Sequence, residues 1–171
     1  PTGRSIAEFI EGWQRNDAEI AARWAHMWRL GKPIIAAVNG WAMGGGFWYQ
    51  LAADITIASD KAVFAQPEVR HISNSSFLFT ALFGWKGADR WALTGHDFQA
   101  EEAYRIGLLN HLVPRAQLRA KTMELAKMIA ANHRGAVTGI KTLLLQQMGK
   151  GLEEQFNAEK VSVSTVVINP H

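Results

Sequence analysis

The chain of 171 residues contains no cysteine, which excludes disulfide-bonded scaffolds, zinc sites built on thiolates, and thiol nucleophiles. Its apolar runs fall well short of the roughly 20 residues that a membrane-spanning helix needs. No signal segment with a charged start and an apolar stretch opens the chain. These absences predict a soluble protein, and we expect it in the cytoplasm with no membrane partner.

Charged residues are few, at 19% of the chain against 48% apolar residues, which is typical of a globular domain and excludes a disordered sequence. The net charge is +3, yet residues 115–150 carry seven basic residues and one acid. Such spaced charges ordinarily cover solvated helix faces, although they could also face an anionic ligand, an acidic partner or RNA. No five basic residues stand in a row, which argues against nucleic-acid binding.

Hydrophobic patterning predicts alternating helices and strands up to Pro67. Apolar residues recur at helical spacing over residues 20–30, until Gly31 and Pro33 end that helix. A buried strand over 34–38 follows and is bounded by a turn at Asn39 and Gly40. Three glycines at 44–46 then begin a helix that reaches Ala53, and further strands are predicted over 55–58 and 62–65.

The remainder of the chain has a mostly helical pattern. Helices are predicted over 77–85, 89–93, 100–106, 115–131, 136–148 and 152–163, with an extended segment over 108–113. Strand–helix–strand units followed by helices predict an α/β fold. We expect an α/β core over residues 1–114 and a helical region over residues 115–171.

Two kinds of site find no support in the sequence. The six histidines form no pair at i and i+4, so a helical metal site is not expected, and we predict no metal. Ser73, Ser75 and Ser76 lie in no G-x-S-x-G segment, which argues against serine hydrolysis.

The most informative segment is the glycine turn at Gly44, Gly45 and Gly46, between a buried strand and a helix. Glycines let a ligand approach the backbone, and the N–H groups at a helix start point toward negative charge. The spacing fits neither the dinucleotide nor the P-loop phosphate motif. The other use that an enzyme makes of such a glycine turn is an oxyanion hole, in which N–H groups hold a carbonyl oxygen that gains charge during the reaction. A tight packing turn is the structural alternative.

Glu68 follows Gly45 by 23 residues, at the end of an apolar strand and in the segment Gln66-Pro67-Glu68. A carboxylate in apolar surroundings is suited to moving protons near neutral pH. The structural alternative is a surface glutamate that caps a loop. Together with the glycine turn, Glu68 predicts a site for enolate chemistry.

At this point the sequence resembles the crotonase superfamily, the enoyl-CoA hydratase/isomerase proteins. The matching segments are KPIIAAVNGWAMGGG (32–46), AADI (52–55), FAQPEV (64–69), LTG (93–95) and AEEAYRIGLLNHLVP (100–114). The resemblance extends over about residues 30–165. It implies a spiral of β-β-α units with a helical C-terminal region that assembles trimers or dimers of trimers.

The resemblance also implies roles for particular residues. The N–H of Gly45 would hold the thioester oxygen of an acyl-CoA substrate, and Glu68 would act as acid and base. No cofactor is implied, since the coenzyme A thioester is itself the substrate. We expect substrate contacts from residues near the glycine turn and the following loop, namely Ala42, Met43, Gly44, Trp48, His71 and Phe77.

The sequence departs from the family pattern in three places. Hydratases of the family carry a second glutamate where this chain has Trp48, so addition of water by two carboxylates is not expected. The segment after Glu68 is VRHISNSSFLF in place of a glycine- and proline-rich loop, and His71 is a candidate substitute acid or base. The third departure is at the ends, where the family has further β-α units before Ile6 and a last helix. The upstream units supply the second oxyanion N–H, so we expect this chain to be part of a longer protein.

Two functions from different classes follow. The first is an acyl-CoA enzyme of the enoyl-CoA hydratase/isomerase type, in which one base favours double-bond isomerisation over hydration. The second is a binding or assembly module that keeps the fold and has lost the chemistry.

Overall fold

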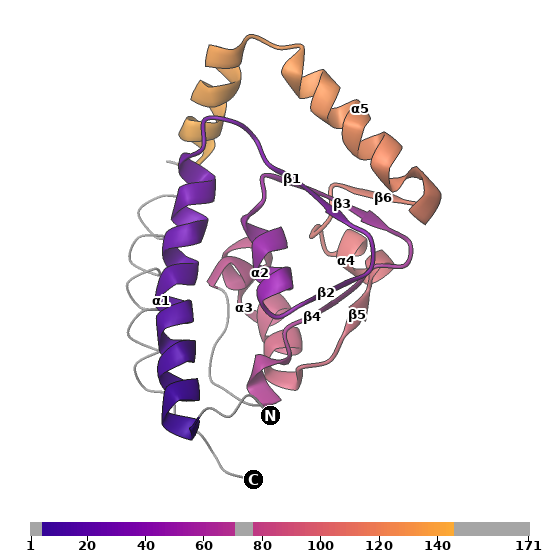
Figure 1. Ribbon diagram of the computed structural model, residues 1–171. Helices are drawn as coiled ribbons and strands as arrows, with labels where there is room; N and C mark the ends of the chain where they lie inside the picture. Colours follow the sequence, from indigo (N-terminus) through magenta and orange to yellow (C-terminus); the bar gives the residue numbers. More distant parts are fainter. Residues whose placement is uncertain (1–4, 71–76, 146–171) are drawn as a thin grey trace.

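The computed structural model describes residues 5–70 and 77–145. The chain begins with the long helix α1 (Ile6–Arg29), which lies along one side of the molecule (Figure 1). Ser5 caps it: the Ser5 hydroxyl accepts from the N–H of Glu8, and the Glu8 carboxylate accepts from the N–H of Ser5. These two bonds satisfy donors that the first helical turn would otherwise leave open.

Within the described residues, six short strands form two three-stranded sheets. Strands β1 (Ile35–Val38), β3 (Ile55–Ser59) and β6 (His111–Val113) form one sheet, in which all pairs are parallel. Strands β2 (Trp41–Met43), β4 (Val63–Ala65) and β5 (Phe98–Gln99) form the other, where β2 and β4 are parallel and β5 is antiparallel to β4. The parallel pairs require a crossover between paired strands, and helices supply it.

The two sheets arise from a repeated strand–strand–helix unit. In the first unit, β1 enters one sheet, β2 enters the other, and α2 (Gly45–Ala52) follows. In the second, β3 pairs with β1, β4 pairs with β2, and the single-turn helix η1 (Pro67–Arg70) leads toward α3 (Phe77–Thr94). This arrangement confirms the predicted α/β fold of crotonase-like β-β-α units.

The helix α3 differs from the two separate helices expected there. It is one helical stretch interrupted at Gly84, whose φ of 71° and ψ of 169° are not helical. The break therefore lies earlier than residues 86–88, where the pattern placed it. The helix α4 (Ala100–Arg105) follows β5 directly.

Between β6 and residue 145 the chain is mostly helical, as expected. The short helix η2 (Arg115–Gln117) leads into α5 (Leu118–Ala130), and residues 134–145 form a further helical segment. Figure 1 shows these two helical stretches forming an arch over the end of β1. The helix predicted over 152–163 lies outside the described residues. The proposed boundary at residue 114 stays a prediction.

The core is aromatic, with Phe47 at its centre. The Phe47 ring packs edge-on against the rings of Phe64, Phe79 and Phe98, at centroid distances of 6.3, 5.1 and 6.0 Å. Such pairs contribute about 0.5–1.5 kcal/mol each beyond the burial of their area. Because these residues come from α2, β4, α3 and β5, the cluster joins both β-β-α units and fixes the start of α2.

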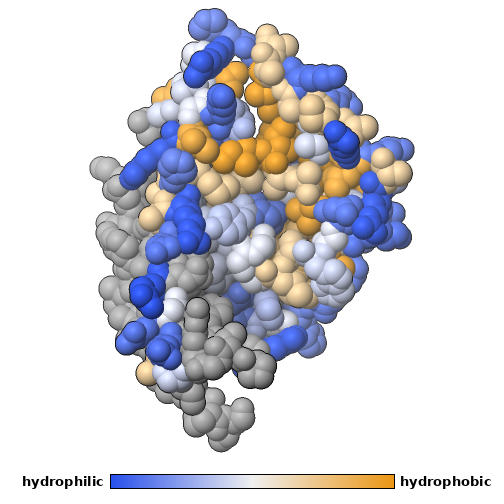
Figure 2. All heavy atoms as spheres, in the orientation of Figure 1, coloured by the Kyte–Doolittle hydropathy of each residue, from blue (hydrophilic) through white to orange (hydrophobic). Residues whose placement is uncertain are grey.

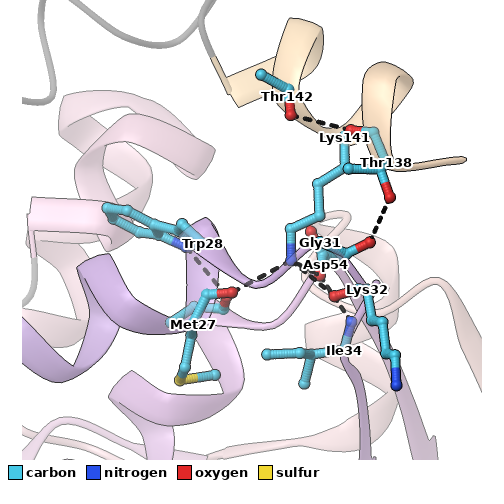
Figure 3. Close-up of polar contacts among 10 residues, drawn as sticks. Met27, Trp28, Gly31, Lys32, Ile34, Asp54, Thr138, Lys141 and Thr142 are labelled. Atoms are coloured by element: carbon cyan, nitrogen blue, oxygen red, sulfur yellow. Dashed lines mark hydrogen bonds and ion pairs between the residues drawn. The ribbon is translucent and has the colours of Figure 1, made fainter. Parts of the chain in front are cut away.

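A buried ion pair attaches the C-terminal helical segment to the core (Figure 3). Lys141 donates from Nζ to Asp54 Oδ2 at 2.8 Å and to the carbonyl oxygens of Met27 and Lys32 at 3.2 and 3.1 Å. Asp54 Oδ2 also accepts from the N–H of Ile34 at 2.7 Å. Lys141 was expected on a solvated helix face. That expectation is wrong, because the side chain is only 6% exposed and its three donors are all used.

Candidate active site

The turn between β2 and α2 has a backbone shape that requires glycine. Gly44 has a φ of 53° and a ψ of −123°, which L-residues with a Cβ rarely adopt. Its N–H donates to the carbonyl of Ala65 in β4 at 3.1 Å, and its carbonyl accepts from the N–H of Trp48 at 3.0 Å. The turn is therefore fixed to the neighbouring strand on one side and to the first turn of α2 on the other.

Gly45 is the first residue of α2, so its N–H lies at the helix N-terminus. Among residues 5–70 and 77–145, no backbone carbonyl accepts a hydrogen bond from this N–H. A Cβ added at Gly45 would meet no atom within 4 Å, so the space beside it is open. An N–H in this position, at the positive end of the helix dipole, can donate to an oxygen that carries negative charge.

Glu68 lies against this turn. It belongs to η1, which begins directly after β4 and Gln66, and its Oε2 atom is buried. A Cβ on Gly44 would stand only 2.7 Å from Glu68 Oε1. The structure therefore brings together the carboxylate and the glycine turn, which lie more than 20 residues apart in the chain.

The other expected site residues lie in different surroundings. Ala42 is buried in β2, and Met43 next to it is 38% exposed beside the turn. Trp48 is only 3% exposed, and its ring packs edge-on against Trp24 of α1 at 5.9 Å, within the core between two helices. Phe77 is the first residue of α3, whereas His71 lies outside the described residues. Their roles as substrate contacts stay predictions.

A hollow lies at the end of α2 opposite to the glycine turn. A cavity of about 430 Å³ opens between the C-terminal end of α2, the segment 134–145 and α3, and among the side chains around it are Trp28, Leu51, Leu82, Ile140 and Leu144. Figure 2 shows apolar atoms gathered beneath α5 and the segment 134–145 on this face of the molecule. Because Gly45 and Glu68 lie at the N-terminal end of α2, this cavity is separate from the candidate site.

Neither this cavity nor the Lys141–Asp54 pair is predicted by the sequence pattern. Both depend on contacts between segments more than 80 residues apart, and no local pattern indicates that these segments meet. In the part of the chain that the structure describes, no three histidine, aspartate or glutamate side chains gather as a metal site would require. No helix of the same residues is long and apolar enough to cross a bilayer.

Comparison with known proteins identifies relatives along most of the chain. It is 30% identical over 151 residues to a 4-chlorobenzoyl coenzyme A dehalogenase of an Arthrobacter species, covering 84% of this chain and 53% of the relative. It is 33% identical over 172 residues to a carnitinyl-CoA dehydratase of Escherichia coli, covering 91% and 66%. The chain thus spans between half and two thirds of the length of these relatives.

A solved structure and a family model agree with these relatives. The crystal structure of an enoyl-CoA hydratase from Mycobacterium avium matches with a TM-score of 0.75 and 31% identity, covering 79% of this chain and 62% of that one. The sequence model of the enoyl-CoA hydratase/isomerase family matches residues 4–168, nearly the whole chain. The glycine turn with Glu68 beside it therefore stands in a chain that belongs to the enoyl-CoA hydratase/isomerase family.

Proposed function

We propose that the chain carries the site of an acyl-CoA enzyme, in which the Gly45 N–H binds the thioester oxygen and Glu68 moves a proton. The contact between Glu68 and Gly44 carries this proposal, because it places a carboxylate beside the helix start that would receive the oxygen. The relatives named above differ in the reactions that their names describe. The reaction of this chain must therefore be inferred from its own residues.

The proposed chemistry begins with the Glu68 carboxylate. It takes a proton from the carbon next to the thioester carbonyl, or from the carbon two positions further along, and the electron pair of that C–H bond moves into an enolate. The thioester oxygen gains charge and is stabilised by the Gly45 N–H, which is held at the start of α2 and needs no reorganisation. Glu68 then returns the proton to a different carbon. The double bond has moved, and no atom has been added.

Trp48 supports isomerisation over hydration. It stands where hydratases that the chain resembles carry a second glutamate, and its ring is buried against Trp24. An indole cannot take a proton from water, since its only polar group is an N–H donor. A single carboxylate can move a proton between two carbons, whereas addition of water needs a further group to orient and activate that water.

The partners of the site follow the same reasoning. An acyl-CoA thioester is the proposed substrate, with no additional cofactor or metal. A homotrimer or a dimer of trimers is the proposed assembly, which light scattering on the purified protein would measure. A cytoplasmic location stays a prediction from the sequence.

The experiment that tests the function uses two substrates that differ in the position of the double bond. The purified full-length protein is mixed with a 2-enoyl-CoA or a 3-enoyl-CoA, and the products are separated by chromatography and then analysed by mass. Interconversion of the two at constant mass is expected. A product of the 2-enoyl-CoA that is heavier by one water would show that the protein catalyses hydration and not isomerisation. If neither substrate changes, the result would favour the binding or assembly module.

A further inference from the structure

The helix η1, which carries Glu68, is held between two glycines from different elements. Gly44 lies on one side, and Gly95, which follows the end of α3, lies on the other. Both have a positive φ, of 53° and 61°. A Cβ on Gly44 would stand 2.7 Å from Glu68 Oε1, and a Cβ on Gly95 would stand 2.9 Å from Val69 Cγ1. A larger residue at either position would require one of these side chains to move.

Arg70 joins η1 to the end of α3. Its Nη2 donates to the carbonyl of Gly95 at 2.8 Å, and its Nε lies 3.4 Å from the position that a Gly95 Cβ would take. Gly95 is itself fixed, because its N–H donates to the carbonyl of Trp91 at 2.9 Å. The Trp91 ring packs on the core ring of Phe98 at a centroid distance of 4.5 Å. A continuous series of contacts thus runs from the aromatic core to η1.

A single-turn helix needs such support. Four residues with 3-10 geometry have little stability of their own, and a glutamate side chain has three rotatable bonds to fix. Contacts of Val69 and Arg70 on the α3 side leave Glu68 directed toward the Gly44 turn. The position of the Glu68 carboxylate therefore depends on the hydrogen bond that Arg70, two residues further along the chain, makes with Gly95 at the end of α3.

We propose that Arg70 and Gly95 are positioning residues, which hold η1 so that the Glu68 carboxylate stays against the Gly44–Gly45 turn. This inference rests on the proposed function for the role of Glu68, but the positioning itself is a separate claim. Arg70 contacts Gly95 rather than the turn, so it acts through Glu68. Displacement of a reacting group by about 1 Å can cost about a hundredfold in rate.

Three substitutions of Arg70 separate its hydrogen bond from its charge. Arg70→Met keeps the aliphatic stem and removes the donor, Arg70→Gln keeps a donor without charge, and Arg70→Lys keeps both. Because Arg70 is exposed, all three variants are expected to fold with an unchanged melting temperature. Arg119→Met, at an exposed position on α5, is the matched control.

The first readout is steady-state kinetics with the acyl-CoA that the full-length protein turns over. Arg70→Met is expected to lower kcat about tenfold to a hundredfold with KM within about twofold. Arg70→Gln and Arg70→Lys are expected to recover most of the rate, and Arg119→Met to match the unsubstituted protein. An unchanged kcat in Arg70→Met would overturn the proposal. Recovery by Arg70→Lys but not by Arg70→Gln would also overturn it, because charge and not the hydrogen bond would then matter.

The second readout does not need activity. The amide chemical shifts of Gly44 and Gly45 are followed by NMR while the pH is lowered and the carboxylates take up protons. A pH-dependent change of these shifts that is absent in Glu68→Gln is a response to the Glu68 carboxylate beside the turn. Arg70→Met is expected to lose this response, and a retained response would contradict the proposal. If the unsubstituted protein has the response but turns over no acyl-CoA, the proposed function fails while the positioning stands.

Discussion

The Glu68 carboxylate fills the space that a side chain at position 44 would need. Glu68 Oε1 stands 2.7 Å from where a Gly44 Cβ would lie, and the Gly44 N–H donates to the carbonyl of Ala65 just before the segment that carries Glu68. The glycine turn and the acid are therefore fixed to each other through β4. A substrate oxygen held at Gly45 would lie beside the carboxylate that we propose moves the proton.

Gly44→Ala tests this contact. The new Cβ would meet Glu68 Oε1, and the φ of 53° is strained for alanine, so a loss of about 1–3 kcal/mol in the free energy of unfolding is expected. Turnover should fall by about a hundredfold, since the carboxylate must move. Denaturant unfolding and steady-state kinetics measure the two effects.

Gly139→Ala is the matched control for Gly44→Ala. Gly139 lies in the helical segment 134–145, and its Cβ would meet no atom within 4 Å. This variant should gain about 0.5–1 kcal/mol in the free energy of unfolding and keep its turnover. Equal behaviour of the two variants would contradict the close contact between Gly44 and Glu68.

Lys141→Met tests the ion pair that attaches the segment 134–145 to the core. It leaves Asp54, only 21% exposed, without its cation and two carbonyls without their donor. The free energy of unfolding should fall by about 3 kcal/mol, the lower end for a broken buried pair because Asp54 retains some contact with water. Thermal and denaturant unfolding measure this loss.

Lys121→Met is the surface counterpart. Lys121 pairs with Glu124 at 2.8 Å on α5, and both side chains are partly exposed to solvent. Because solvent screens such a pair, its loss should cost less than about 1 kcal/mol. A cost for Lys141→Met no larger than that for Lys121→Met would show that the buried pair does not hold the segment.

Trp48→Glu tests whether a second carboxylate can be restored at this position. The Trp48 ring is buried against Trp24, so a glutamate there would place a charge among apolar side chains. We expect a loss of more than about 3 kcal/mol in the free energy of unfolding and no gain of hydration. Trp48→Phe should be far milder in the same unfolding experiment. A stable Trp48→Glu variant that adds water to a 2-enoyl-CoA would contradict the position found for this side chain.

The pKa of Glu102 predicts how its pairing with Arg105 responds to acidic pH. Arg105 donates two hydrogen bonds to its carboxylate, at 2.6 and 2.7 Å, and this pair lowers the pKa of Glu102. Because the pKa of Glu102 is lower in the folded state, its ionised form stabilises the fold at pH values above the ordinary pKa of glutamate. This stability is lost as the pH falls through the lowered pKa of the folded state. Arg105→Gln should raise the pKa of Glu102 toward its ordinary value, measured by carbon-13 NMR. An unchanged titration would show that Arg105 is not its cause.

The sequence predicted those parts of the fold that have a pattern of their own. The apolar run 34–38 and the glycines at 44–46 correctly predicted β1 and the start of α2. β2 was missed because its three residues, between Gly40 and Gly44, are too few to show an alternation, and β5 has only two. Lys141 was placed on the surface because its partners are an aspartate 87 residues away and two backbone carbonyls, which no local pattern indicates.

The candidate site, like the fold, could be predicted only in part from the sequence. Gly44, Gly45 and Glu68 could be named because glycines at a helix start and a glutamate after a strand have recognisable chemistry. Their contact depends on the pairing of β2 with β4, which the sequence does not state. The hydrogen bond from Arg70 to the carbonyl of Gly95 could not be predicted either, because it depends on where α3 ends.

The most direct test of the central claim is exchange of carbon-bound hydrogen in heavy water. An acyl-CoA is incubated in D₂O with the full-length protein, with Glu68→Gln, or with the control Glu101→Gln, which changes an exposed acid on α4. Deuterium incorporation is followed by mass. We predict incorporation with the unsubstituted protein and Glu101→Gln, and at least about a hundredfold slower incorporation with Glu68→Gln. Equal incorporation with Glu68→Gln would remove Glu68 from the proton transfer and contradict the proposed mechanism.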